Sequence, residues 1–198
     1  MKILAFVDLH GSLTALKEIK KKAKKADIIV CAGDLTIFEA DMEFLIDELS
    51  HLGKEIIMVH GNHEGADYMK EVCGFYDNIH FIHKKKKVIG DVLFLGYGGK
   101  GFSIEDEEFD KLAKKFEKWI KSSKAEKVVL VSHAPPYGTK LDKIGGEFVG
   151  NLSLKEFIVN METHLLVCGH LHETAGKKDE IEGTLMINPG PKGKIVEV

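Results

Sequence analysis

Short apolar runs recur along the chain and alternate with longer segments that mix apolar and charged residues. Uninterrupted apolar runs of this length are typical of strands that are buried on both faces. The pattern therefore predicts a β-strand at each of the ranges 3–7, 28–32, 56–59, 92–95, 128–131 and 165–168.

The longer segments carry apolar residues at three- and four-residue spacings, the period of an amphipathic helix. They cover 13–26, 42–52, 66–72, 109–120 and 154–161, and Ser12 and Ser153 are candidate N-caps. Alternating strands and helices favour an α/β fold with helices on both faces of a sheet that is largely parallel in the first half of the chain.

The rhythm changes toward the end, where strand-like ranges 184–188 and 194–198 are joined by the turn-rich Pro189–Gly193 with no helix between them. We expect an antiparallel ending and a second sheet. The predicted fold class is α/β, with central mixed β-sheets forming a two-sheet sandwich flanked by helices.

Length and charge narrow the function classes. The 198 residues fit one domain, 1–198, and the formal net charge of -3 offers no broad attraction for nucleic acid or an anionic membrane. All basic side chains are lysine, so no guanidinium can clamp a phosphate in bidentate fashion. The lysine runs 20–25 and 84–87 are expected to be solvated faces.

No segment is long and apolar enough for a signal sequence or a membrane span, which predicts a cytoplasmic location. The three cysteines, Cys31, Cys73 and Cys168, have no paired spacing, and Cys31 and Cys168 lie in apolar runs. We expect reduced core thiols and no disulfide framework.

Polar, chemically capable residues follow most of the predicted strands. They are Asp8 and His10, Asp34, Asn62 with His63 and Glu64, His133, and His170 with His172, usually beside a glycine. Because ligands of open α/β sheets bind at the carboxyl ends of the strands, these clusters are expected to converge on one site.

The cluster offers two carboxylates, one amide oxygen and four imidazoles as metal ligands. Mixed nitrogen and oxygen donors suit Mn, Fe, Zn, Ni or Co better than Ca, and the donors are too many for one tetrahedral ion. A centre of two ions that share a carboxylate follows as a hypothesis. Cys168 is interpreted as strand core rather than as a ligand.

The ordered blocks Asp-x-His, Gly-Asp, Gly-Asn-His-Glu, His and Gly-His-x-His, spanning residues 8 to 172, resemble the signature of the calcineurin-like metallophosphoesterases. The resemblance implies that fold. It also implies that Asp8, His10 and His172 hold one metal, that Asn62, His133 and His170 hold the other, and that Asp34 bridges them. His63 would be a catalytic histidine outside the ligand set, and Glu64 a residue that orients it.

The activity implied by the resemblance is hydrolysis of a small phosphate ester by a hydroxide held between two divalent ions, of which Mn is favoured, with His63 assisting the leaving group. A phosphodiester is favoured over a phosphomonoester. The alternatives are a non-catalytic scaffold of the same fold, which the presence of His63 disfavours, and a nuclease for long DNA, which the charge disfavours. A homodimer is implied by the resemblance alone.

The chain departs from the family pattern at Val7 and Pro191, where many members have Ser or Thr and Ser respectively. The glycine-rich stretch Gly96–Phe102 lacks a Walker pattern, but it follows a predicted strand. This position makes Tyr97, Lys100 and Phe102 candidates for the rim of the site, and Tyr137 and Lys140 are weaker candidates.

Overall fold

A computed structural model describes residues 1–198 and contains two main β-sheets. The five-stranded sheet has the order β13-β1-β2-β3-β4, with β1–β4 parallel and β13 antiparallel to β1. Its strands are β1 (Lys2–Phe6), β2 (Ile28–Cys31), β3 (Glu55–Met58), β4 (Ile79–Phe81) and β13 (Lys194–Glu197).

The six-stranded sheet has the order β11-β12-β10-β7-β6-β5, with parallel pairing from β12 to β6 and an antiparallel strand at each edge. Its strands are β5 (Lys86–Ile89), β6 (Val92–Tyr97), β7 (Lys127–Ser132), β10 (Leu165–Val167), β11 (Lys178–Ile181) and β12 (Thr184–Ile187), and a separate hairpin joins β8 (Lys143–Ile144) to β9 (Glu147–Phe148).

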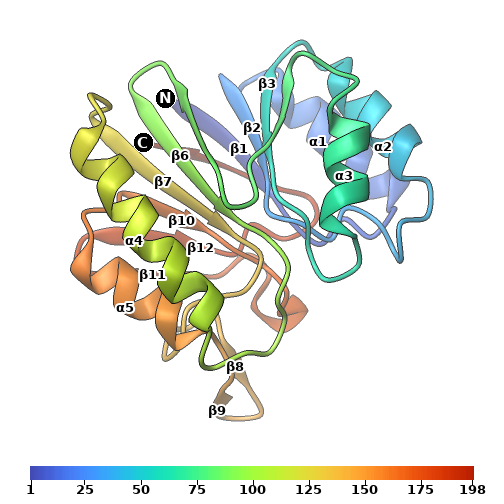
Figure 1. The fold of residues 1–198 in the computed structure, drawn as a ribbon. Coiled ribbons are helices and arrows are strands. Elements are labelled where there is room, and N and C mark those ends of the chain that lie inside the picture. Colours follow the sequence, from blue (N-terminus) through green and yellow to red (C-terminus); the bar gives the residue numbers. More distant parts are fainter.

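Helices cover the outer face of each sheet, so that the molecule has four layers (Figure 1). The first sheet carries α1 (Leu13–Ala23), α2 (Met42–Ser50) and α3 (Ala66–Cys73), and the second carries α4 (Glu107–Ser122) and α5 (Leu152–Asn160). A short 3₁₀ helix, η1 (His172–Thr174), follows β10. The predicted fold class, a helix-flanked two-sheet sandwich, is confirmed.

The continuous apolar runs are explained by this layering. In β1, Leu4 and Phe6 pack against the helices, while Ile3 and Ala5, and Val7 directly after the strand, pack in the cluster between the two sheets. Both faces of each central strand are therefore removed from water, and each large buried side chain contributes about 1.5–3 kcal/mol.

The two C-terminal strands are antiparallel to a neighbour, as expected, but they do not pair with each other. β12 joins the second sheet beside β10 and β11, whereas β13 crosses to the first sheet and pairs with β1. The N-terminal amine of Met1 consequently donates a hydrogen bond to the carbonyl oxygen of Val198 at 2.8 Å, and both termini lie together (Figure 1).

One predicted cap is confirmed and the other is wrong. The Oγ of Ser12 accepts a hydrogen bond from Ala15 N at the start of α1. Helix α5 begins two residues earlier than a Ser153 cap requires, because the Oδ1 of Asn151 accepts from Leu154 N at 2.9 Å. Ser153 lies inside the helix, and its Oγ accepts from Asp106 N.

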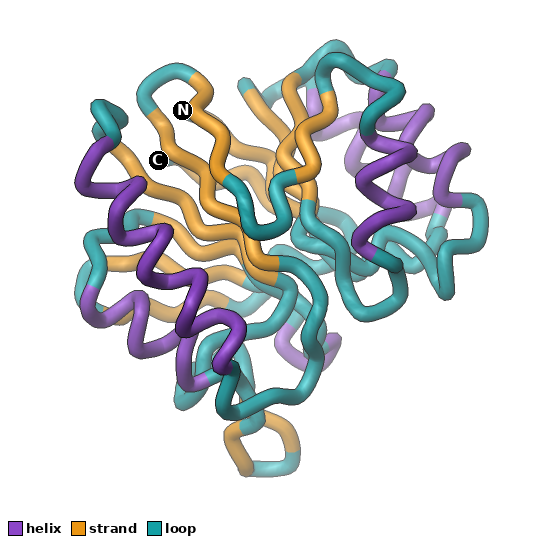
Figure 2. Tube along the Cα trace, in the orientation of Figure 1, coloured by secondary structure: helices purple, strands orange, loops and turns teal.

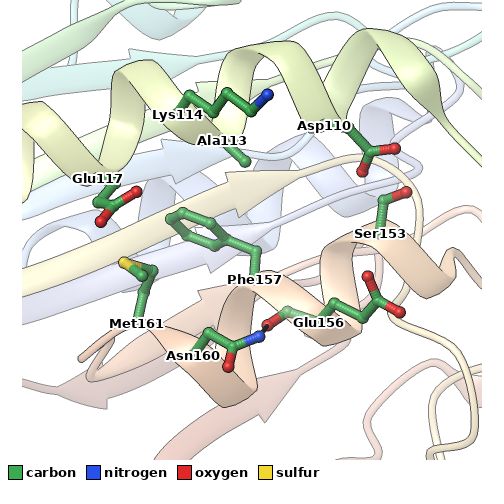
Figure 3. Close-up of a pocket in the computed structure, with 9 residues that line it drawn as sticks. All are labelled: Asp110, Ala113, Lys114, Glu117, Ser153, Glu156, Phe157, Asn160 and Met161. Carbon is green, nitrogen blue, oxygen red and sulfur yellow. Dashed lines mark hydrogen bonds between the residues drawn. The ribbon is translucent and has the colours of Figure 1, made fainter.

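All three cysteines are free and buried, as the sequence predicted. No helix has both the length and the apolar character needed to cross a membrane. A groove of about 230 Å³ runs between α4 and α5, floored by Phe157 (Figure 3). Its lining includes none of the candidate site residues.

Candidate metal centre

The candidate metal ligands, with His63 and Glu64, lie in the segments that follow the carboxyl ends of β1, β2, β3, β7 and β10, and His172 begins η1. The two sheets pack face to face with these ends on the same side, so the loops gather between the helical layers (Figure 2). The structure thereby brings together residues that are more than 160 positions apart, such as His10 and His172, whose Nε2 atoms are 3.0 Å apart.

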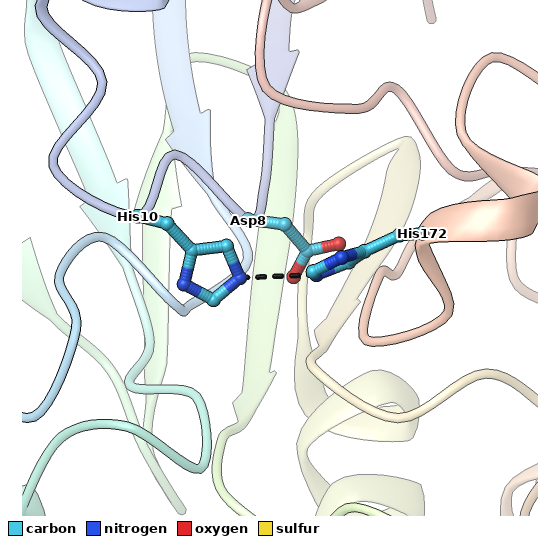
Figure 4. Close-up of side chains that lie close together, drawn as sticks. All are labelled: Asp8, His10 and His172. Atoms are coloured by element: carbon cyan, nitrogen blue, oxygen red, sulfur yellow. Dashed lines mark hydrogen bonds between the residues drawn. The ribbon is translucent and has the colours of Figure 1, made fainter.

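Asp8, His10 and His172 form one group of possible metal ligands (Figure 4). The Nδ1 of His10 lies 3.2 Å from the carbonyl oxygen of Thr36, which leaves its Nε2 facing the Nε2 of His172. A neutral imidazole that donates a hydrogen bond through Nδ1 carries only a lone pair at Nε2. The Nε2 atoms of His10 and His172 can therefore lie this close only if a proton or a cation is between or beside them. The Oδ2 of Asp8 is buried nearby without a hydrogen-bond partner.

Asp34, His133 and His170 form a second group, with Asn62 beside them. The Nδ1 of the fully buried His133 lies 3.0 Å from Ala32 O, while its Nε2 faces the Oδ1 of Asn62 at 3.0 Å and the Oδ2 of Asp34 at 3.4 Å. A carbonyl bonded to Nδ1 fixes the tautomer that directs the Nε2 lone pair at a metal. Several acceptors then face one another, an arrangement that a cation would stabilise.

Asp34 belongs to the second group and also lies close to His10 of the first group. Its Oδ2 is 3.4 Å from Nε2 of His133, 3.8 Å from Nε2 of His10 and 3.9 Å from Nε2 of His63. Burial raises the pKa of Asp34, but contacts with His133 and His63 outweigh it and lower the pKa to about 2. Asp34 therefore remains an anion at the middle of the cluster.

The neighbouring pKa values fit the same picture. Burial, with repulsion from Asp34, raises the pKa of Asp8 against the opposing influence of His133. Burial, followed by repulsion from His133, lowers the pKa of His170 to about 4, which keeps that imidazole neutral. Burial opposes protonation of His133, yet Asp34 raises its pKa.

Four candidate residues adopt left-handed backbone conformations, which are costly for residues other than glycine. They are Asp8, His10, Asp34 and His170, with φ of 54°, 48°, 49° and 68°. The packing around them holds this strain. At Gly61 a Cβ would lie 1.9 Å from the Oδ1 of Asp34, so the loop needs a residue without a side chain there.

The residues fit divalent metal ions. The buried Oδ2 of Asp8 belongs to the first ligand group and has no hydrogen-bond partner, and the Nδ1 of His170 faces the Oδ1 of Asn62 at 2.9 Å. The facing lone pairs at His10 and His133 need a positive partner. The donor types are those of transition-metal sites, with no thiolate among them. The assignment of individual residues to each ion stays a prediction.

Glu64 has a different place from the one expected. Its carboxylate accepts hydrogen bonds from Thr36 N, Thr36 Oγ1 and Gly61 N at 2.8, 2.9 and 2.8 Å, and from Asp34 N at 3.2 Å. It makes no hydrogen bond to the ring of His63, whose Nδ1 has no partner. Glu64 therefore ties the loop after β3 to the loop after β2 instead of orienting His63 directly.

We expect Glu64→Gln to lower the free energy of unfolding of the metal-free protein by about 2–6 kcal/mol. The amide nitrogen cannot accept a hydrogen bond, so two of the buried donors lose their acceptor, at about 1–3 kcal/mol each. Urea unfolding measures the change, and Glu71→Gln on the exposed face of α3 is the matched control. A loss no greater than in the control would contradict the linking role of Glu64.

Most of the rim candidates have partners away from the cluster. Tyr97 is buried and donates a hydrogen bond to Asp106 at 2.7 Å, so it belongs to the core of the second sheet. The ammonium groups of Lys100 and Lys140 pair with Glu108 and Asp179 respectively. Tyr137 packs against Phe148 of the β8–β9 hairpin.

Of the rim candidates, only Phe102 reaches the cluster, where its ring lies 4.6 Å from that of His170. Sequence reasoning missed a second aromatic residue, Phe38, whose ring lies 4.7 Å from that of His63. No motif includes Phe38, so no signal in the sequence marks it.

A small cavity of about 240 Å³ adjoins the first group and is lined by Asp8, His10, His172, Ala175 and Pro191. Pro191, one of the two departures from the family pattern, thus shares a cavity wall with three candidate ligands. Val7, the other departure, is absent from the cavity lining and packs between the sheets.

The chain is similar to known proteins in sequence and in fold. Residues 1–174 match the family model described as calcineurin-like phosphoesterase. An uncharacterized protein, MJ1162 of Methanocaldococcus jannaschii, is 34% identical over 212 residues, covering 99% of this chain and 91% of its own.

Two solved structures share the fold. TT1561 of Thermus thermophilus has a TM-score of 0.78 at 19% identity, covering 96% of this chain and 90% of its own. A dimetal phosphatase from Danio rerio has a TM-score of 0.60 at 10% identity, covering 95% and 86%.

Proposed function

Because the chain belongs to the calcineurin-like phosphoesterase family, we propose that it hydrolyses phosphate esters at the cluster around Asp34, and that phosphodiesters are preferred over phosphomonoesters. The observation that carries the proposal is the pair of ligand groups meeting at one buried carboxylate, with the half-buried His63 beside it.

The metal ligands in this proposal are Asp8, His10 and His172 on one side, Asn62, His133 and His170 on the other, and Asp34 between them. Divalent transition-metal ions, with Mn favoured, would supply Lewis-acid chemistry there, because they lower the pKa of water and offset charge on phosphate oxygens. The carbonyl oxygens of Thr36 and Ala32 orient two of the imidazoles for this task.

His63 is proposed to donate a proton to the leaving oxygen of the ester. Its backbone N–H donates to the Oδ1 of Asp34 at 3.0 Å, and its Nε2 lies 3.9 Å from the Oδ2 of the same carboxylate. Asp34 therefore fixes the position of the residue and places a negative charge beside its ring. Glu64 supports the arrangement from behind by holding both loops.

The preference for diesters follows from charge. A phosphomonoester dianion carries more negative charge than a diester, and extra charge usually calls for arginine or lysine. The chain contains no arginine, and no lysine forms a hydrogen bond or ion pair with a candidate metal ligand. Neutralisation of the phosphate would therefore fall mainly to the metal ions, which favours the singly charged ester.

The test is hydrolysis of bis-p-nitrophenyl phosphate and p-nitrophenyl phosphate by metal-stripped protein to which Mn(II), Ni(II), Zn(II) or Mg(II) is returned. We expect turnover only after metal is restored, and a higher kcat/KM for the diester. A higher kcat/KM for the monoester would reverse the preference. Metal binding without turnover of either ester would count against an enzyme.

A further inference from the structure

Two exposed phenylalanines lie against histidines of the metal centre. Phe38 is 78% exposed and its ring centroid is 4.7 Å from that of His63, while Phe102 is 65% exposed and its ring centroid is 4.6 Å from that of His170. Phe38 follows β2 of the first sheet and Phe102 follows β6 of the second. Each sheet thus contributes one aromatic side chain to the edge of the centre.

The backbone conformation and the exposure of Phe38 are both energetically unfavourable. Its φ of 48° is left-handed, a conformation that bulky residues rarely adopt, and most of its ring is in water. The loop is nevertheless fixed, because Thr36 Oγ1 accepts from Glu39 N at 3.1 Å and Glu39 Oε1 accepts from Gly65 N at 2.7 Å. Strain of this kind is typical of residues placed for function.

The position of Phe102 depends on glycines. A Cβ at Gly101 would lie 2.7 Å from Cε1 of His170, and a Cβ at Gly99 would lie 2.8 Å from Nε2 of His60. Gly99 N also donates to His60 O at 2.8 Å. The backbone of this loop can therefore pack in contact with the imidazoles of His60 and His170. This close packing places the ring of Phe102 beside His170.

We propose that Phe38 and Phe102 bind a planar aromatic group of the substrate, so that aryl or nucleoside phosphoesters are selected over alkyl phosphoesters. The proposal rests on the function proposed above, because the phosphate must lie at the histidines that the two rings contact. The exposed ring of each phenylalanine offers a stacking or edge contact, which aromatic groups make more favourably than aliphatic groups of equal size.

The test is titration calorimetry of the full chain loaded with Mn(II), using phenylphosphonate, cyclohexylphosphonate and methylphosphonate. We expect phenylphosphonate to bind about two- to tenfold more tightly than cyclohexylphosphonate, and methylphosphonate to bind most weakly. A comparison of AMP with ribose 5-phosphate, which lacks the base, tells whether a nucleobase or only a simple aryl group is accepted.

Phe38→Ala and Phe102→Ala should each reduce the preference for phenylphosphonate, while Phe38→Trp should retain it. Phe75→Ala is the matched control, because Phe75 is 76% exposed and contacts no candidate residue. Metal content and circular dichroism verify that each variant is folded and loaded.

Equal binding of the phenyl and cyclohexyl compounds, a preference that survives both alanine variants, or no binding of any phosphonate would overturn the proposal. Ester hydrolysis is measured separately on the same samples. An aromatic preference without hydrolysis would overturn the proposed enzyme activity and leave the aromatic site intact. Hydrolysis without an aromatic preference would overturn the aromatic site and leave the proposed enzyme activity intact.

Discussion

Replacing His63 by alanine is expected to lower kcat for diester hydrolysis about 10²- to 10⁴-fold while the protein keeps its full metal content. The Nε2 of His63 lies 3.9 Å from Asp34, but the residue is absent from the two ligand groups assigned above, so its loss removes a proton donor and not a ligand. The separation of activity from metal content is the informative result.

The measurement combines steady-state kinetics with elemental analysis of the dialysed, metal-loaded variant. His51→Ala is the matched control, because His51 is exposed at the end of α2 and contacts only Asp47 and Ser50. The triplet His10, Asp34 and His63 also satisfies the geometry of a metal group. Loss of one metal in His63→Ala would therefore make His63 a ligand and contradict the role of proton donor.

Replacing Asp34 by asparagine is expected to weaken the binding of both metal ions about 100-fold or more and to abolish turnover. Asp34 belongs to two of the three possible ligand groups and is the only carboxylate between them. Its charge is lost in the variant, whereas an amide oxygen can still accept the hydrogen bond from His63 N, so the loop is retained. Loss of an outer-shell partner alone costs about 10- to 100-fold in metal affinity, and a direct ligand should cost at least as much.

Metal titration by calorimetry and elemental analysis after dialysis measure this effect. Asp110→Asn is the matched control, because Asp110 lies on α4 in the groove away from the cluster (Figure 3). If Asp34→Asn lost only one ion, the two groups would be independent sites and Asp34 would not be shared.

Most of the site could be predicted because its information is local in the sequence. The buried strands are short apolar runs, and several are followed directly by candidate metal ligands, such as Asp8 and His10 after β1 or His133 after β7. The rule that strand ends converge then predicts one cluster without any knowledge of pairing. Strand β5 (Lys86–Ile89) was missed because it is an edge strand in which lysines interrupt the apolar signal.

By itself, the sequence determined the α/β class, the core strands and which polar residues the fold brings into one cluster, because periodicity and residue type are read along the chain. Only the tertiary structure decided that β13 joins β1 and not β12, that Asn151 caps α5 before Ser153, and that Glu64 binds the loop after β2. It alone also placed Phe38 and Phe102 beside His63 and His170. These outcomes depend on contacts between segments far apart in sequence. Residues with similar local propensity could each take the same structural role, and packing in the folded protein decides which of them does.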